Sequence, residues 1–218
     1  MRKVREMKTI RKYLGKLLRN NQNFSGRYWE KRYWSGGSSG AGSYGRLAQH
    51  KADVINDFIE KYNINSVIEL GCGDGNQLLY MKYPEYTGFD VSNNVIQKCR
   101  EKFSTDTHKT FLHISKLDQQ KADLTLSLDV IFHLVEDAVF QQHMRQLFQA
   151  SNRYVIIYSS NHNDNSDTAP HVRHRKFTAW VEQNITDFEF IDRIDNKYPL
   201  TSDPENETFS NFYIYRKI

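Results

Sequence analysis

Three alternating glycines form the segment of this sequence best suited to hold a bound molecule. Gly71, Gly73 and Gly75 directly follow residues 67–70, whose three apolar members, Val67, Ile68 and Leu70, suit a short buried parallel strand. Glycine has no Cβ and permits positive φ, so such a loop lets backbone N–H groups approach a ligand closely. The segment predicts a cofactor cradle; the alternative is a core turn whose glycines only permit close packing.

Three acids around the loop indicate the charge of that cofactor. Glu69 lies two residues before the first glycine, Asp74 lies within the loop, and Asp90 ends the next apolar stretch. An acid at the end of a second strand can accept hydrogen bonds from ribose hydroxyls. The glycines lack the GxGxxG spacing that seats a pyrophosphate, and Glu69 and Asp74 would repel one. S-adenosylmethionine, which carries an ammonium and a sulfonium and no phosphate, suits these charges better than NAD.

Two segments resemble motifs of a known family. VIELGCGDG (67–75) resembles the first motif of class I S-adenosylmethionine-dependent methyltransferases, and YTGFDVS (86–92) resembles their second. The resemblance covers residues 46–218, about one catalytic domain, and the Gly-rich segment before it also resembles bacterial methyltransferases found with surface-polysaccharide enzymes. The cofactor residues that we expect from the motifs and their surroundings are Tyr44, Gly45, Glu69, Gly71, Cys72, Gly73, Asp74, Gln77, Asp90, Val91, Asp106 and Asp129.

Apolar periodicity predicts the elements that position this loop. We expect a three-layer α/β sandwich with a seven-stranded, mostly parallel sheet, an antiparallel last strand and an N-terminal helical extension. The glycine loop should lead into a helix, and the ends of the first, second and fourth strands should meet at one edge, where open α/β sheets bind ligands. The expected strands are 67–70, 86–90, 110–113, 122–128, 154–158, 188–194 and 209–215, and the expected helices include 46–62, 93–103, 135–150 and 176–184.

An acid and an imidazole follow the fourth strand, at the edge where the ends of the first, second and fourth strands should meet. Asp129 and His133 resemble the family's motif at this place, which here lacks the Asn-Pro-Pro-Tyr type sequence of enzymes that methylate amino groups of adenine or glutamine. Oxygen is therefore the favoured acceptor atom. His133 could remove the proton of an acceptor hydroxyl, or could be held by backbone hydrogen bonds at a helix start. Asp129 could bind the cofactor ammonium, orient the acceptor, or cap a helix.

A dense set of polar side chains follows the fifth strand. Arginine forks bind phosphate or carboxylate, so this set predicts an anionic acceptor such as a sugar phosphate, nucleotide-linked sugar, uronic acid or phosphoramidate. The alternative is a charged helical turn exposed to water. The histidines lack regular ligand spacing, so no metal is expected. The expected substrate-binding residues are His133, Asn161, His162, Arg173, His174 and Arg175.

The N-terminal segment carries the basic character of the chain. The net charge is +4, but residues 1–20 hold eight Lys or Arg and one Glu, so the remainder carries −3. We expect residues 1–45 to form a basic helical extension followed by an aromatic and Gly/Ser-rich lid or tether, and residues 46–218 to form the catalytic domain. The basic helix could contact an anionic membrane surface, a partner enzyme or nucleic acid, or pack on its own domain. No nucleic-acid recognition motif accompanies it, so nucleic acid is not the expected partner.

Composition sets the remaining expectations. No apolar stretch approaches the roughly 20 residues needed to cross a bilayer, and the two cysteines show no metal-like spacing, so we expect a cytoplasmic protein with at most peripheral contact at the inner membrane surface. The sequence does not indicate an oligomeric state. The predicted function is O-methylation of a small anionic acceptor in capsule or surface-polysaccharide synthesis. The alternatives are an RNA methyltransferase guided by the basic tail and a non-catalytic, cofactor-binding scaffold.

Overall fold

Seven strands form one sheet in the order β3-β2-β1-β4-β5-β7-β6. The computed structural model describes residues 24–166 and 168–218, so the basic segment 1–20 lies outside the described residues. β7 runs antiparallel to β5 and β6, and the other pairings are parallel, which confirms the predicted fold class. The strands are β1 (Ser66–Leu70), β2 (Glu85–Asp90), β3 (Lys109–His113), β4 (Ala122–Leu128), β5 (Ser151–Ser159), β6 (Phe188–Ile194) and β7 (Asn211–Lys217).

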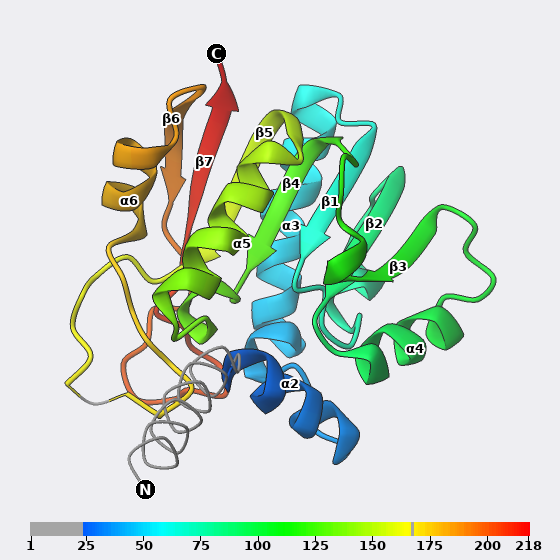
Figure 1. The fold of residues 1–218 in the computed structure, drawn as a ribbon, viewed down its shortest axis with the longest axis horizontal. Helices are drawn as coiled ribbons and strands as arrows, with labels where there is room; N and C mark the ends of the chain where they lie inside the picture. The colour runs from blue at the N-terminus through cyan, green and yellow to red at the C-terminus, as the bar shows by residue number, and fades with distance from the viewer. Residues whose placement is uncertain (1–23, 167) are drawn as a thin grey trace, which may run out of the picture.

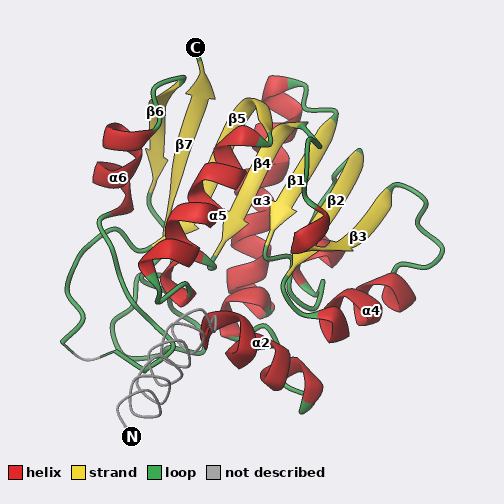
Figure 2. Cartoon of the chain, in the orientation of Figure 1, coloured by secondary structure: helices red, strands yellow, loops and turns green. Residues whose placement is uncertain are grey.

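Helices cover both faces of the sheet, with α5 and α6 in front of it and α3 behind it in Figure 1. None of the described helices combines the length and the apolar character needed to cross a membrane. The α-helices are α2 (Phe24–Trp34), α3 (Gly45–Tyr62), α4 (Asn93–Lys102), α5 (Asp137–Gln149) and α6 (Phe177–Asn184). The short 3-10 helices are η1 (Ala41–Ser43), η2 (Gln77–Tyr80), η3 (Ile114–Lys116) and η4 (Ile131–His133). Figure 2 separates these helices from the connecting loops by colour.

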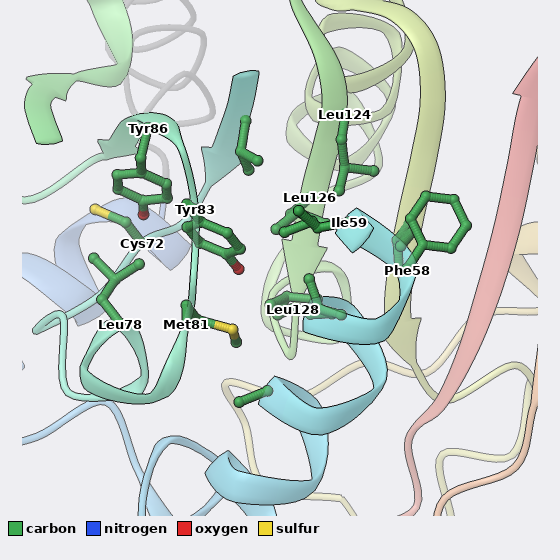
Figure 3. Close-up of a cluster of buried hydrophobic side chains, with 14 of the residues drawn as sticks. Phe58, Ile59, Cys72, Leu78, Met81, Tyr83, Tyr86, Leu124, Leu126 and Leu128 are labelled. Carbon is green, nitrogen blue, oxygen red and sulfur yellow. The ribbon is translucent and has the colours of Figure 1, made fainter. Parts of the chain in front are cut away.

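Alternation along the strands divides the core into two layers. In β1, Val67 packs with the cluster that contains α3 residues, whereas Ile68 packs with the cluster that contains α5 residues. This follows from the period of two in a strand, which sends successive side chains to opposite faces. Figure 3 shows the first layer, where Phe58 and Ile59 of α3 lie near a leucine of β4, Leu126. The two layers hold the strand ends in fixed positions at one edge.

The connection after the glycine loop differs from the prediction. A helix was expected there, but only the 3-10 turn η2 forms between β1 and β2. Nine residues separate Gly75 from β2, and one of them is Pro84, which cannot donate a backbone hydrogen bond. The glycine loop takes the first five of the 14 residues in this connection, and the nine that remain are fewer than the roughly 11–12 of an average α-helix. The connection therefore closes with a single turn.

The connection between β3 and β4 is also short. It contains the 3-10 helix η3 and no α-helix, because eight residues join His113 to Ala122. Ile114, the first residue of η3, follows the end of β3 directly and lies at the same edge as the glycine loop. A single 3-10 helix, η3, therefore lies beside the ends of β1 and β2 in place of an α-helix.

Candidate active site

A cavity of about 220 Å³ opens at the carboxyl ends of β1, β2 and β4. The glycine loop and α2 both contribute residues to its lining, and Figure 1 shows α2 below the carboxyl ends of the strands. Ser25, Gly26, Trp29 and Tyr33 line it from α2, and α5 adds further side chains. The candidate site therefore combines the strand edge predicted from the sequence with an N-terminal helix whose contribution was left open.

The glycine loop requires glycine for both backbone and packing reasons. Gly71, Gly73 and Gly75 have φ values of 92°, 56° and 66°, in the left-handed region that favours glycine. A Cβ on Gly71 would lie 2.4 Å from a methyl carbon of Val130, and one on Gly73 would lie 2.3 Å from Ser39 Oγ. The loop therefore needs glycine both for its backbone conformation and for its close packing against Val130 and Ser39.

Two buried acids face this loop. Tyr86 donates its hydroxyl to Glu69 Oε2 (2.7 Å), and burial raises the Glu69 pKa from 4.5 to about 7. Asp90 accepts hydrogen bonds from the backbone N–H groups of Gly73 (3.1 Å) and Ser92 (2.9 Å), and burial raises its pKa from 3.8 to about 6. Desolvation penalises the charged form of each carboxyl. A cation bound nearby would favour their ionised forms, which is the behaviour expected of a site for a positively charged cofactor.

Asp74 anchors the segment before α3. Its Oδ2 accepts hydrogen bonds from the Ser39 backbone N–H and the Tyr44 hydroxyl, both at 2.8 Å, and burial raises the pKa of Tyr44 to about 12. Tyr44 and Gly45 were expected to touch the cofactor. From this segment the cavity lining takes Ser39 and Ser43 instead. The Gly/Ser-rich segment therefore lies against the glycine loop, and one oxygen of Asp74 is already used to hold it.

Asp129 lies at the end of β4 and pairs with a buried lysine. Lys51 Nζ contacts Asp129 Oδ2 at 2.7 Å, and Ser210 donates its hydroxyl to Asp129 Oδ1 at 2.7 Å. Asp129 has a φ of 58°, and the Lys51 side chain is only 1% exposed. Both carboxylate oxygens therefore have partners within the protein. This arrangement favours a positioning role for Asp129 over direct capture of the cofactor ammonium.

Lys51 was missed in the sequence analysis, although a signal was present. It falls on the same face of α3 as the buried residues Leu47, Ala48, Ala52 and Ile55. A lysine on the apolar face of a helix is rarely buried without a partner. That position alone predicts an acid opposite Lys51.

His133 lies at the edge of the cavity in an aromatic setting. Its Nδ1–H donates to the carbonyl oxygen of His171 (3.1 Å), its ring stacks on that of His171 with 5.4 Å between centroids, and Trp29 meets it at 4.9 Å and 77°. Burial lowers its pKa to about 4. The imidazole is therefore neutral at physiological pH, and the hydrogen bond at Nδ1 leaves Nε2 as the unprotonated nitrogen.

A second buried histidine, His143 of α5, was not predicted as a site residue. It lines the cavity and its Nε2 is hydrogen-bonded to Ser127 Oγ (2.9 Å), while burial lowers its pKa to about 4. Its position in a run of helical polar residues gives no local indication of this environment. Only the packing of α5 against β4 reveals it.

α2 is fixed to the domain at both ends. Glu136 accepts hydrogen bonds from the backbone N–H groups of Phe24 and Ser25 and from the Ser25 hydroxyl (2.5 Å), so a carboxylate lies at the start of the helix. Near its other end, Lys98 of α4 donates to the carbonyl oxygen of Tyr33 (3.1 Å). The side chains that α2 presents to the cavity therefore have defined positions.

The arginines expected to bind an anionic acceptor have partners elsewhere. Arg173 and Arg175 both contact Asp137 (3.0 and 3.1 Å). Both also donate to the carbonyl oxygen of Val135 at 2.9 Å. They tie the loop after β5 to the start of α5 and line a separate hollow that also includes Lys176. Their donors thus stabilise the fold, and neither arginine is among the described residues that line the cavity at the glycine loop.

The other predicted substrate residues also make internal contacts. Asn161 exchanges hydrogen bonds with Thr178 in the first turn of α6 (3.0 and 3.3 Å), in the manner of a helix cap. His174 Nδ1 is hydrogen-bonded to Ser160 Oγ (2.6 Å), and the His162 ring lies 4.4 Å from that of His174. None of these three residues is among the cavity-lining residues of the described chain.

Asp106 lies at the wrong end of the sheet for the adenine contact expected of it. It precedes β3 and pairs with Lys109, which is in register with Tyr86 at the start of β2, whereas His113 is in register with Asp90 at the ligand edge. The loop that follows a parallel strand reaches this edge, and the loop that precedes it does not. The predicted cofactor residues that do line the cavity are Glu69, Gly71, Cys72, Gly73, Asp74, Gln77, Asp90, Val91 and Asp129.

Comparison with known proteins agrees with this geometry. Residues 67–153 match the family model of a methyltransferase domain. The magnesium protoporphyrin IX methyltransferase ChlM from Synechocystis PCC 6803, solved with S-adenosylhomocysteine, has 14% identity and a TM-score of 0.61 over 94% of this chain and 100% of its own. No curated protein matches the sequence closely enough to count as a relative.

Two further structures have the same fold. The N-methyltransferase NodS from Bradyrhizobium japonicum WM9, in complex with S-adenosylhomocysteine, has 11% identity and a TM-score of 0.63 over 78% of this chain and 87% of its own. The methyltransferase domain of bacterial CtHen1-C has 18% identity and a TM-score of 0.60 over 79% of this chain and 99% of its own. The chain therefore has the class I methyltransferase fold, and the segment that matches the family model runs from β1 to the start of β5.

Proposed function

We propose that this S-adenosylmethionine-dependent methyltransferase transfers a methyl group to an oxygen atom of a small, uncharged acceptor. The cofactor supplies a methyl group on a sulfonium, which an acceptor displaces in line. The observation that carries the proposal is the neutral imidazole of His133, held beside Trp29 at the end of β4.

The charges of the cavity fit this cofactor. Among the described residues that line it, none is lysine or arginine, whereas Glu69, Asp74, Asp90 and Asp129 are acids. Such a site attracts the ammonium and sulfonium and would repel a pyrophosphate. Asp90 at the end of β2 is placed to accept hydrogen bonds from the ribose, and the glycine loop allows close approach of the backbone.

His133 can assist transfer although its pKa is low. An acceptor hydroxyl becomes strongly acidic only as it attacks the methyl group, so a weak base in hydrogen-bond contact is sufficient to take the proton. The fixed Nδ1–H donation to His171 presets the tautomer that accepts at Nε2. Because burial keeps His133 neutral, we expect no loss of rate from its protonation above about pH 5.

The same charges argue for an uncharged acceptor. An anion would enter a cavity that no lysine or arginine of the described chain lines, and nearby Lys51 is already paired with Asp129. The arginines that suggested an anionic acceptor are paired with Asp137. The aromatic ring of Trp29 can instead lie against the flat face of a sugar or phenol ring. A role in capsule or surface-polysaccharide synthesis is compatible with a neutral sugar hydroxyl and remains part of the proposal.

The test is methyl transfer to a panel of neutral sugars, phenols and their phosphorylated counterparts, read as S-adenosylhomocysteine formation. We expect turnover with a neutral acceptor, and His133→Ala to lower kcat about 100-fold while the Kd for S-adenosylhomocysteine changes less than twofold. His162→Ala, outside the cavity lining, is the matched control and should retain wild-type kcat. Turnover only with phosphorylated acceptors, or an unchanged kcat in His133→Ala, would contradict the proposal.

The alternatives make different predictions in the same assay. An RNA methyltransferase would methylate RNA and lose salt-sensitive RNA binding when residues 1–20 are deleted. A scaffold protein would bind the cofactor and form no product with any acceptor.

A further inference from the structure

We infer that Glu30 of α2 forms part of the cofactor's ribose subsite, where its carboxylate and that of Asp90 accept hydrogen bonds from the ribose diol. The inference rests on the proposed cofactor and adds a residue that lies outside both sequence motifs. It assigns α2 a direct role in cofactor binding.

The first observation is an unpartnered oxygen. Glu30 Oε1 accepts a hydrogen bond from the Asn94 side-chain amide (2.6 Å), but Glu30 Oε2 is buried and has no hydrogen-bond partner. Among the described lysines and arginines, none forms an ion pair with Glu30. A buried acceptor without a partner is costly, so such an atom in a native structure calls for a donor.

The second observation is the position of Glu30. Asn94, its partner, lies in the first turn of α4, which begins directly after Ser92, the residue whose N–H donates to Asp90 Oδ1 (2.9 Å). One turn along α2, Tyr33 lines the cavity, and its hydroxyl contacts Ser39 Oγ (3.0 Å) beside the glycine loop. Glu30 is therefore placed between the first turn of α4 and the part of α2 that lines the cavity, and its charge acts on Asp90.

The two carboxylates interact through space. The charge of Glu30 contributes to the raised pKa of Asp90, although burial is the larger cause. Two acids whose charges act on each other repel unless donors lie between them. A ribose diol has two O–H groups, one for each carboxylate, and hydrogen bonds from a ligand favour the ionised forms. The bound cofactor would thus remove the repulsion and satisfy Glu30 Oε2.

Glu30→Gln tests this role without disturbing the docking of α2. A glutamine oxygen can still accept from Asn94, but the amide nitrogen that replaces Oε2 cannot accept from a hydroxyl. Isothermal titration would compare S-adenosylhomocysteine with its 2′-deoxy and 3′-deoxy analogues. The matched control is Glu60→Gln, because Glu60 is exposed near the end of α3.

We expect Glu30→Gln to bind S-adenosylhomocysteine about tenfold more weakly than wild type. The deoxy analogue that lacks the hydroxyl bound by Glu30 should bind the variant and the wild type with Kd values within twofold of each other. Glu60→Gln should bind all three ligands as wild type does. Unchanged affinity in Glu30→Gln, or an equal loss for all three ligands, would overturn the inference and leave the proposed function intact. Failure of the wild-type protein to bind S-adenosylhomocysteine would overturn both.

Discussion

Replacing Glu69 with glutamine should make the protein more stable at alkaline pH. Glu69 is a carboxyl at the end of β1 that is 4% exposed and whose only hydrogen-bonded side-chain partner in the described chain is the Tyr86 hydroxyl. Glutamine has nearly the same shape and can still accept that hydrogen bond. The substitution therefore removes the ability to ionise while it preserves the packing.

The size of the effect follows from the pKa of Glu69, which burial raises from 4.5 to about 7. The folded state then binds the Glu69 proton more tightly than the unfolded state does. The resulting stability is fully present below about pH 4.5 and is lost as the pH rises through 7. The difference between the two pKa values corresponds to about 3 kcal/mol. Glu69→Gln should match wild type near pH 4.5 and exceed it by about 3 kcal/mol at pH 8.

Urea unfolding at pH 4.5, 6, 7 and 8 measures this difference directly. Asp90 also has a raised pKa, but it is present in both proteins, so the difference between them isolates Glu69. Glu60→Gln, at an exposed position, controls for the loss of one negative charge. A difference between Glu69→Gln and wild type that does not grow with pH, or a variant that is less stable at pH 8, would refute the reasoning.

Three further predictions test other parts of the site. Lys51→Met should lower the free energy of unfolding by about 3 kcal/mol because it leaves the partly buried Asp129 without its counter-charge, and adding Asp129→Asn should recover most of the loss; urea unfolding of both variants checks this. Gly73→Ala should weaken S-adenosylhomocysteine binding at least tenfold in calorimetry, since alanine disfavours a φ of 56° and its Cβ would clash with Ser39. Asp106→Asn should leave that Kd within twofold of wild type, and a tenfold change would contradict its placement at the far end of the sheet.

The sheet and its ligand edge could be predicted because their signals are local. A strand's period of two and the glycine loop after β1 depend on neighbouring residues, and right-handed crossovers then fix where the strand ends meet. Glu69 and Asp90 were found for the same reason, since each is attached to a strand. The helix expected after Gly75 could have been excluded from the short distance to Pro84. Asp106 was misplaced because it precedes a strand, and only residues that follow one reach the ligand edge.

Long-range pairing accounts for what the sequence could not reveal. Nothing local to Arg173 and Arg175 indicates that Asp137, more than thirty residues earlier, takes up their guanidinium groups. Likewise, the low pKa of His133 comes from burial under Trp29 and His171, which belong to segments distant in the sequence. These contacts changed the expected acceptor from anionic to uncharged.

Isothermal titration of the purified protein with S-adenosylmethionine, S-adenosylhomocysteine and NAD tests the central claim most directly. The acids of the cavity and the tight glycine loop predict micromolar binding of the first two ligands and no binding of NAD. Binding of NAD, or of none of the three, would contradict the assignment of this cavity to a methyl-donor cofactor.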